Sequence, residues 1–120
     1  MKYFLDTYAL IEIAKGNQKY QKYLESDCVT LKDNLAELFY FLLKKYNEKI
    51  ANLFIEKFSK IAIEFPIDII SKAMIFKYKN SKSNFSYIDC FGYIYAIETR
   101  IFFLTGDRAF TNFANVEIVR

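Results

Sequence analysis

Two short apolar runs in this sequence each lead into an aspartate, and this pattern restricts the possible folds more than any other feature. The run Tyr3-Phe4-Leu5 is followed directly by Asp6, and the run 101–104 is followed three residues later by Asp107. Runs this short are typical of strands buried on both faces of a parallel sheet. Open α/β sheets bind their ligands at the carboxyl ends of such strands. Both aspartates are therefore predicted to lie at a ligand-binding edge.

The rest of the sequence alternates between strand-like and helix-like segments. We expect strands at 2–6, 28–29, 61–65, 101–104 and 116–119. We expect helices at 7–15, 17–25, 30–46, 47–59, 66–78, 86–98 and 108–113. Because parallel strands must be joined by crossover connections, usually helices, the alternation predicts an α/β fold with a mainly parallel sheet covered on both faces.

Local signals mark several helix ends. The segments Thr30–Asp33 and Ser86–Asp89 each match a capping box, in which the first and fourth residues satisfy each other's backbone N–H groups. Gly16 is expected to cap the end of the first helix. Pro66 fits the first turn of a helix, and the polar segment 79–84 is expected to be a loop.

Length and composition indicate one small domain. The 120 residues match the common size of a single domain, so we expect residues 1–120 to form one unit. The net charge of +3 permits nucleic-acid binding without requiring it. Aromatic residues are frequent, with 13 Phe and 10 Tyr. A domain this small cannot bury all of them, which predicts a homodimer through helical surfaces.

The sequence contains no histidine, which removes histidine-based acid–base catalysis and most zinc sites. Cys28 and Cys90 lie apart in apolar stretches without metal-ligand spacing, so we interpret them as small buried residues in a reducing compartment. No apolar run approaches the ~18 residues that cross a membrane, and Asp6 cuts short the apolar N-terminal run. We therefore expect a cytoplasmic location.

Two further acids lie near the starts of helical segments. Asp89 shares a helical face with Gly92 and Ala96, whose small side chains let the helix approach its neighbour closely. Glu37 lies in an unusually apolar helical segment, with Asn34 one turn earlier. An enclosed acid needs a partner. These surroundings direct both acids toward the interior of the fold.

Four acids are therefore candidates for a shared site: Asp6, Glu37, Asp89 and Asp107. Each one alone also fits an ordinary role as a helix cap, a turn residue or a solvated helix residue. Together, converging carboxylates would repel one another unless a cation neutralised them. Oxygen ligands suit Mg²⁺, which retains waters and takes only a few carboxylates. The set predicts a metal-dependent enzyme.

Four motifs follow one another in a fixed order: Leu5-Asp6-Thr7 leading to Gly16-Asn17, Asn34-Leu35-Ala36-Glu37, Ser86-Tyr87-Ile88-Asp89, and Leu104-Thr105-Gly106-Asp107-Arg108-Ala109-Phe110. In this order and spacing, the chain resembles PIN-domain proteins, and specifically toxins of the VapC type. The resemblance covers nearly the whole chain. It departs from the family pattern at Tyr8, where a small polar residue is common, and at Tyr93 and Ile94, where alanine is usual.

The resemblance implies a three-layer α/β/α fold that binds Mg²⁺ or Mn²⁺ and hydrolyses RNA. It implies that the four acids hold the metal and carry catalysis, and that Thr105 supports the last of them, with Asn34 a second candidate for support. A bound metal would make water a better nucleophile toward phosphorus, which Glu37 is a candidate to deprotonate or orient. The resemblance further implies a homodimer and a small antitoxin protein whose tail covers the active site.

Other interpretations share part of this pattern. A PIN nuclease of RNA processing, without a toxin role, would carry the same residues. A protein of another class, a catalytically silent module that binds RNA or protein, would be favoured if one of the four acids were missing, and none is. A phosphatase of the haloacid dehalogenase type needs a second aspartate where this chain has Tyr8, and a receiver domain needs paired early acids.

Overall fold

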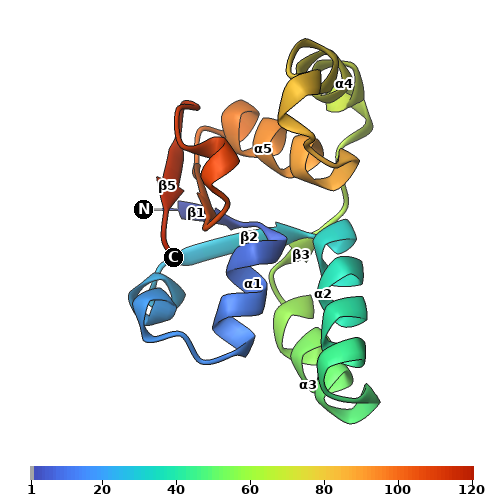
Figure 1. The fold of residues 1–120 in the computed structure, drawn as a ribbon, viewed down its shortest axis with the longest axis vertical. Coiled ribbons are helices and arrows are strands. Elements are labelled where there is room, and N and C mark those ends of the chain that lie inside the picture. Colours follow the sequence, from blue (N-terminus) through green and yellow to red (C-terminus); the bar gives the residue numbers. More distant parts are fainter. Residues whose placement is uncertain (1) are drawn as a thin grey trace.

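Five short strands form one parallel sheet in the order β3-β2-β1-β4-β5 (Figure 1). The computed structural model describes residues 2–120, and its strands are β1 (Lys2–Leu5), β2 (Asp27–Leu31), β3 (Ala62–Ile63), β4 (Phe102–Thr105) and β5 (Val116–Ile118). The two apolar runs that precede aspartates are β1 and β4, and they pair at the centre of the sheet. The prediction of an α/β fold with a parallel sheet is confirmed.

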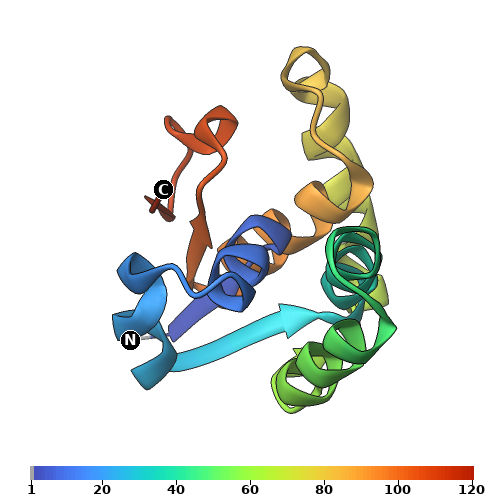
Figure 2. The same ribbon diagram turned by 60° about the horizontal axis from the view of Figure 1, so that its bottom comes forward.

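Helices connect the strands and cover both faces of the sheet. They are α1 (Thr7–Ala14), α2 (Lys32–Lys45), α3 (Glu48–Ser59), α4 (Ile70–Lys79) and α5 (Tyr87–Thr99), with shorter-pitch 3-10 helices η1 (Gln18–Glu25), η2 (Ile67–Ile69), η3 (Ser81–Ser83) and η4 (Arg108–Phe110). Helices α1, α2 and α3 lie on one face, with α2 and α3 side by side, and α4 and α5 lie on the other (Figures 1 and 2). Among residues 2–120, no helix has the length and apolarity to cross a bilayer.

The two layers of helices bury separate hydrophobic clusters, because successive strand residues point to opposite faces. Leu5 and Leu104 pack under α1 and α2, whereas Phe4 and Phe103 pack under α5. The second cluster is largely aromatic, and its fully buried Phe110 stacks on Phe85 with ring centroids 4.3 Å apart. All 13 phenylalanines are buried or half-buried. The aromatic residues left on the surface are therefore tyrosines.

Several predicted boundaries were wrong. The Thr30–Asp33 capping box does not form: the Thr30 hydroxyl donates to the Leu5 carbonyl at 2.7 Å, and the cap of α2 is Leu31, which makes no side-chain bond. Strand β2 is longer than expected because its last two residues, Thr30 and Leu31, pair with β3. Strand β3 is shorter, since this edge strand meets only Thr30 and Leu31 of β2.

Pro66 does not lie in the first turn of a helix but precedes it, as the cap of η2. The helix predicted at 108–113 is only the short η4 (Arg108–Phe110), and the segment predicted as a loop, 79–84, contains η3 (Ser81–Ser83). Two other predicted helix ends are confirmed. Ser86 and Asp89 form a complete capping box at the start of α5. Gly16 follows α1 with a φ of 81°, a left-handed conformation that glycine adopts without steric cost.

Gly92 lies where α5 crosses β1, and it allows the close approach that the sequence predicted. A Cβ atom at this position would lie 2.7 Å from the Phe4 ring and 3.3 Å from the Phe103 ring. Phe4 is fully buried and stacked on Phe103, with 5.6 Å between ring centroids, so it has no free space to move into. The helix that carries Asp89 is therefore seated directly on the sheet.

We expect Gly92→Ala to destabilise the protein by about 1–3 kcal/mol, the usual cost of overpacking a core. On an exposed helix the same change would be stabilising, by about 1 kcal/mol. A loss of stability would therefore identify overpacking against the sheet as the cause. Urea unfolding measures the effect. The penalty should shrink in a Phe4→Leu background, where the ring is absent, and an equal penalty in both backgrounds would contradict this interpretation.

Candidate active site

Asp6 stands at the point where β1 ends and α1 begins. Its side chain caps α1 by accepting a hydrogen bond from the Ala9 N–H at 2.9 Å, and its own N–H donates to the Leu104 carbonyl at 3.3 Å. Only 4% of the residue is exposed. The ordinary role of helix cap, considered for the sequence alone, is thus real, but it does not explain a carboxyl group buried this deeply.

Asp107 lies at the adjacent strand end, because Leu104 of β4 is aligned with Leu5 of β1. Its carboxylate caps η4 through the Ala109 N–H at 2.9 Å. Its N–H donates to the Thr105 hydroxyl at 3.0 Å, and the same hydroxyl hydrogen-bonds the Asp6 carboxyl. Thr105, which is fully buried, therefore connects the two strand-end acids.

Asp89 is delivered from the opposite face of the sheet by the first turn of α5. Its carboxylate accepts a hydrogen bond from the Ser86 N–H at 2.9 Å, and the Ser86 hydroxyl accepts one from the Asp89 N–H at 3.0 Å. The reciprocal pair fixes one carboxylate oxygen. The charge of Asp89 also raises the pKa of Asp6 and of Glu37, as described below.

Glu37 is supported by a short hydrogen-bond network from α1 and α2. The Thr7 hydroxyl donates to the Glu37 carboxylate, and the Asn34 side-chain amide donates to the Thr7 oxygen at 3.0 Å. Asn34, one turn before Glu37, therefore contacts the acid indirectly, through the Thr7 hydroxyl. Thr7 received no role from the sequence, although a hydroxyl residue directly after a strand-end acid was a signal for one.

Three of the four acids, Asp6, Glu37 and Asp89, have raised pKa values. Burial raises the pKa of Asp6 to about 7, against hydrogen bonds from Thr105 and Ala9 that lower it, and the charges of Asp89 and Asp107 raise it further. Burial also raises the pKa of Asp89, and the charge of Asp107 raises it further. Burial likewise raises the pKa of Glu37, and the charge of Asp89 raises it further. The structure thus brings all four predicted acids into one electrostatically coupled region.

The donor chemistry of this region fits a hard divalent cation. It offers carboxylate oxygens and the side-chain carbonyl oxygen of Asn34, which is buried and has no hydrogen-bond partner among the described residues. No group of three or more His, Cys, Asp or Glu within residues 2–120 is spaced to hold an ion directly. Mg²⁺ commonly binds through one or two carboxylates and retains several waters, so a looser arrangement still fits it.

The departure at Tyr8 has a structural counterpart at Gly106. A Cβ atom at Gly106 would lie 2.0 Å from the Tyr8 ring, so the ring occupies the space that a larger residue would need. Gly106 lies between Thr105 and Asp107. The unusual Tyr8 is therefore accommodated by the absence of a side chain at Gly106, directly before Asp107.

Comparison with known proteins agrees with this arrangement. The family model described as the PIN domain matches residues 3–116. No curated protein matches this chain in sequence.

Solved structures share the fold at low sequence identity. Mycobacterium tuberculosis VapC20, a toxin that cleaves the sarcin-ricin loop, matches with a TM-score of 0.81 and 13% identity, over 97% of this chain and 98% of its own. The promoter-bound VapBC2 of Rickettsia felis gives 0.78 and 19%, over 100% of both chains. The DNA-bound VapBC of Salmonella typhimurium gives 0.77 and 16%, over 99% and 97%. With the parallel sheet, the four coupled acids and a family match over most of its length, the chain belongs to the PIN-domain family.

Proposed function

We propose that this protein is an endoribonuclease dependent on Mg²⁺ or Mn²⁺, and the toxin of a VapBC-type toxin–antitoxin pair. One observation carries the proposal: Asp6 is buried at the carboxyl edge of a PIN-domain sheet and is coupled to Asp89 and Asp107. A buried acid of this kind is costly unless a cation neutralises it. Catalytic sites commonly contain such perturbed groups.

Asp6, Glu37, Asp89 and Asp107 would hold the metal, with the Asn34 carbonyl oxygen as a further donor. The metal, when bound, would supply positive charge against the phosphodiester and make water easier to deprotonate. The chain's own contribution is orientation. Thr105 holds Asp6 and Asp107 in register, and Thr7 fixes the Glu37 carboxylate.

Glu37 is the acid best suited to orient or deprotonate the attacking water. It is half-buried and reaches the site from α2, independently of the two strand-end aspartates. Burial raises the pKa of Glu37, and the hydrogen bond from the Thr7 hydroxyl offsets only part of this rise. A carboxylate whose pKa is raised from its ordinary value is a better proton acceptor near neutral pH.

An antitoxin is the partner that the fold matches suggest. The solved complexes from Rickettsia felis and Salmonella typhimurium contain VapBC pairs, and a toxin–antitoxin complex from Klebsiella pneumoniae also shares the fold, with a TM-score of 0.74 and 17% identity. We infer that a small protein encoded with this chain binds it and blocks the site. A PIN nuclease of RNA processing would share the chemistry and lack this partner.

We expect single-stranded or looped RNA to be cleaved in the presence of Mg²⁺ or Mn²⁺ and not in EDTA. Asp6→Asn and Asp89→Asn keep the shape of the side chains but remove charge, so each should reduce cleavage by orders of magnitude. A gel-based assay on labelled RNA measures this effect. Asp68→Asn is the matched control, since Asp68 is exposed on η2, and it should cleave like wild type. Equal cleavage by all variants would indicate a contaminating nuclease.

The buried Asp6 should also make the metal-free protein sensitive to pH. Its pKa is about 7 in the folded protein and about 3.9 in the unfolded chain, so folding favours its protonated form. Burial of protonated Asp6 therefore adds stability that is fully present below about pH 4 and is lost as pH rises toward 7.

In EDTA, the melting temperature of Asp6→Asn should therefore rise relative to wild type between about pH 5 and pH 8. Mg²⁺ should close the gap at the higher pH by stabilising wild type more than the variant. Scanning calorimetry measures both effects. A difference between the two proteins that does not change with pH would mean that Asp6 is not strained by burial.

We propose that the protein is a homodimer paired through η2 and α4. Ile67 and Tyr78 on these helices are 83% and 84% exposed, and Ile70 and Ile75 of α4 are exposed as well. Light scattering should give twice the chain mass of 14.2 kDa. Ile75→Glu should yield monomers, whereas Leu53→Glu on α3, an equally exposed position, should not. A wild-type mass of one chain would refute the dimer and leave the nuclease proposal intact.

A further inference from the structure

A basic pocket lies beside the acidic edge of the sheet, between η1 and the end of β5. Its cationic residues are Lys19 and Lys22 of η1 and Arg120 after β5, and its volume is about 510 Å³. We call it the η1–β5 pocket. No acidic side chain lines it. None of its residues belongs to the four-acid site described above.

The positive charge of the pocket is not neutralised within the protein. Ion pairs among residues 2–120 involve Lys15, Lys32 and Lys72, and none involves a lysine or arginine of the pocket. The Lys22 ammonium lies 5.1 Å from the centroid of the Tyr23 ring, which positions it without removing its charge. Three cations therefore remain available to an anion.

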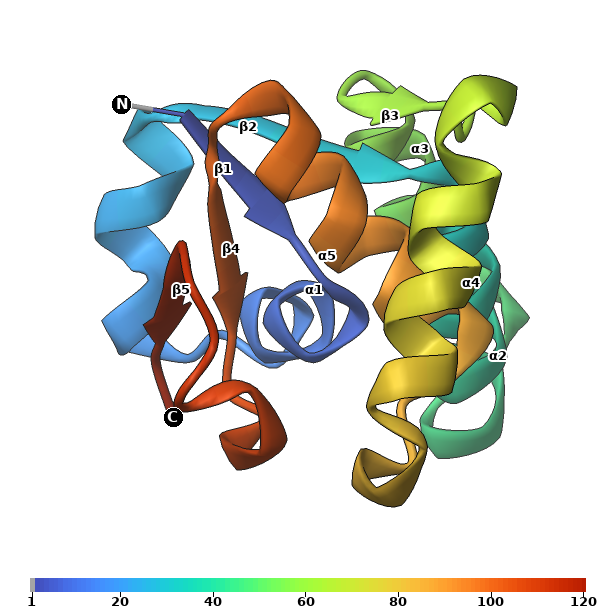
Figure 3. The same ribbon diagram turned by 90° about the horizontal axis from the view of Figure 1, so that it is seen from above.

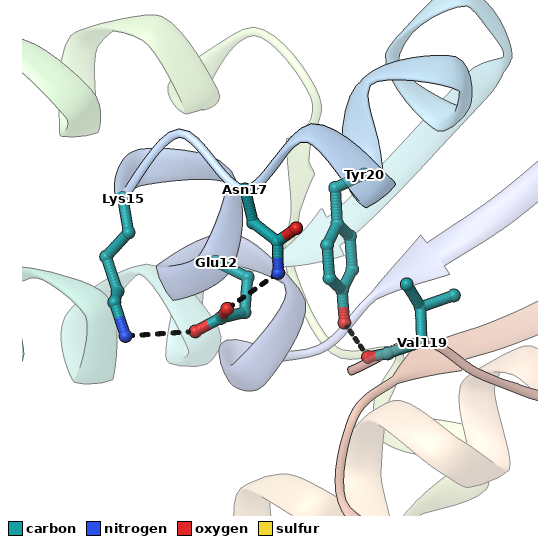
Figure 4. A network of polar contacts seen from close by, with 5 residues as sticks. All are labelled: Glu12, Lys15, Asn17, Tyr20 and Val119. Atoms are coloured by element: carbon teal, nitrogen blue, oxygen red, sulfur yellow. Dashed lines mark hydrogen bonds and ion pairs between the residues drawn. The ribbon is translucent and has the colours of Figure 1, made fainter.

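Two acids of the adjoining elements, Glu12 and Glu117, already have partners. Glu12 accepts a hydrogen bond from the Asn17 side chain at 2.9 Å and pairs with Lys15 at 3.3 Å (Figure 4). Glu117 accepts a hydrogen bond from the Tyr23 hydroxyl. Both acids thus have partners outside the pocket's own cations.

A chain of hydrogen bonds ties the pocket to the acidic site. The Tyr20 hydroxyl of η1 donates to the Val119 carbonyl at 2.5 Å (Figure 4). The Val119 N–H in turn donates to the carbonyl of Thr105, the residue that connects Asp6 and Asp107, at 2.9 Å. The pocket is therefore held at a fixed position relative to the site.

The pocket and the site share the same edge of the sheet. Strand β5 runs parallel to β4, with Ile118 aligned with Thr105, so the chain leaves both strands at the same edge of the sheet. Figure 3 shows the two strands side by side, with the C-terminus at this edge. Neighbouring strands lie about 4.8 Å apart, so the end of β5 is one strand beyond Asp107 and two beyond Asp6. An extended chain crossing the strand ends would pass from the acids to the basic pocket.

We propose that the η1–β5 pocket binds a backbone phosphate of the RNA strand that flanks the cleaved bond. This inference rests on the proposed ribonuclease function and adds a substrate subsite to it. Lysines and arginines neutralise phosphates without reading the base, so the subsite tightens RNA binding independently of sequence. The positive charge of the pocket also offsets the repulsion between the acidic site and the other phosphates of the RNA backbone.

The test compares Lys19→Gln/Lys22→Gln with wild type, using a long single-stranded RNA and a dinucleotide. For the long RNA in EDTA, fluorescence anisotropy should show affinity lower by roughly tenfold and a salt slope smaller by about 1.4, the value for two lost phosphate contacts at about 0.7 each. In Mg²⁺, KM for the long RNA should rise with kcat unchanged. The dinucleotide, too short to reach the pocket, should be cleaved as by wild type.

Two further variants separate the pocket from a general effect of charge. Lys49→Gln/Lys60→Gln removes the same charge from exposed positions at the two ends of α3 and should bind like wild type. Lys19→Arg/Lys22→Arg keeps the charge and should retain affinity. Thermal melts should be unchanged in all three, because these lysines are exposed.

The outcomes distinguish this proposal from the proposed function. Unchanged affinity and salt slope in Lys19→Gln/Lys22→Gln, or an equal loss in the α3 control, overturns the subsite while cleavage by wild type stands. Wild-type RNA binding that depends on the pocket but is never followed by cleavage supports the subsite and overturns the nuclease. A wild-type protein that does not bind RNA at all overturns both.

Discussion

The pairing of β1 with β4 is the interaction on which the rest of the site depends. It aligns Leu5 with Leu104 at the centre of the sheet, so Asp6, Thr105 and Asp107 emerge together at one edge. The same pairing buries Asp6 and raises its pKa to about 7. Much of the surrounding structure consists of groups that make this burial tolerable, through the Ala9 N–H, the Thr105 hydroxyl and the capping geometry of α1.

Around this pair, two other elements, α5 and α2, bring acidic groups inward. Helix α5 delivers Asp89 from the opposite layer, seated on the sheet by Gly92. Helix α2 delivers Glu37, with its carboxylate held through Thr7 and Asn34. The side-chain oxygen of Asn34 has no hydrogen-bond partner among residues 2–120, and the acids repel one another. Both are costs that the folded chain retains, as expected for the cation site proposed above.

The predictions from sequence failed where a tertiary contact outweighed a local signal. Thr30 carries a good capping pattern, yet its hydroxyl bonds the Leu5 carbonyl of the neighbouring strand, because β2 continues through Thr30 to pair with β3. The length of β3 was misjudged for the converse reason: its partner ends after two aligned residues. The position of Thr7 after a strand-end acid suggested a role, but not its partner, since Glu37 is thirty residues away in sequence and meets Thr7 only in the folded chain.

The sequence by itself determined the alternation of elements, the two buried strands, the Ser86–Asp89 cap and the four acids, because each depends on local propensity or on a short spacing. The tertiary structure alone decided that Thr105 links two of those acids, that Tyr8 is matched to Gly106, and that η1 is joined to β5 through Tyr20. These are contacts between residues distant in the chain. Strand order sets them, and no local pattern encodes strand order.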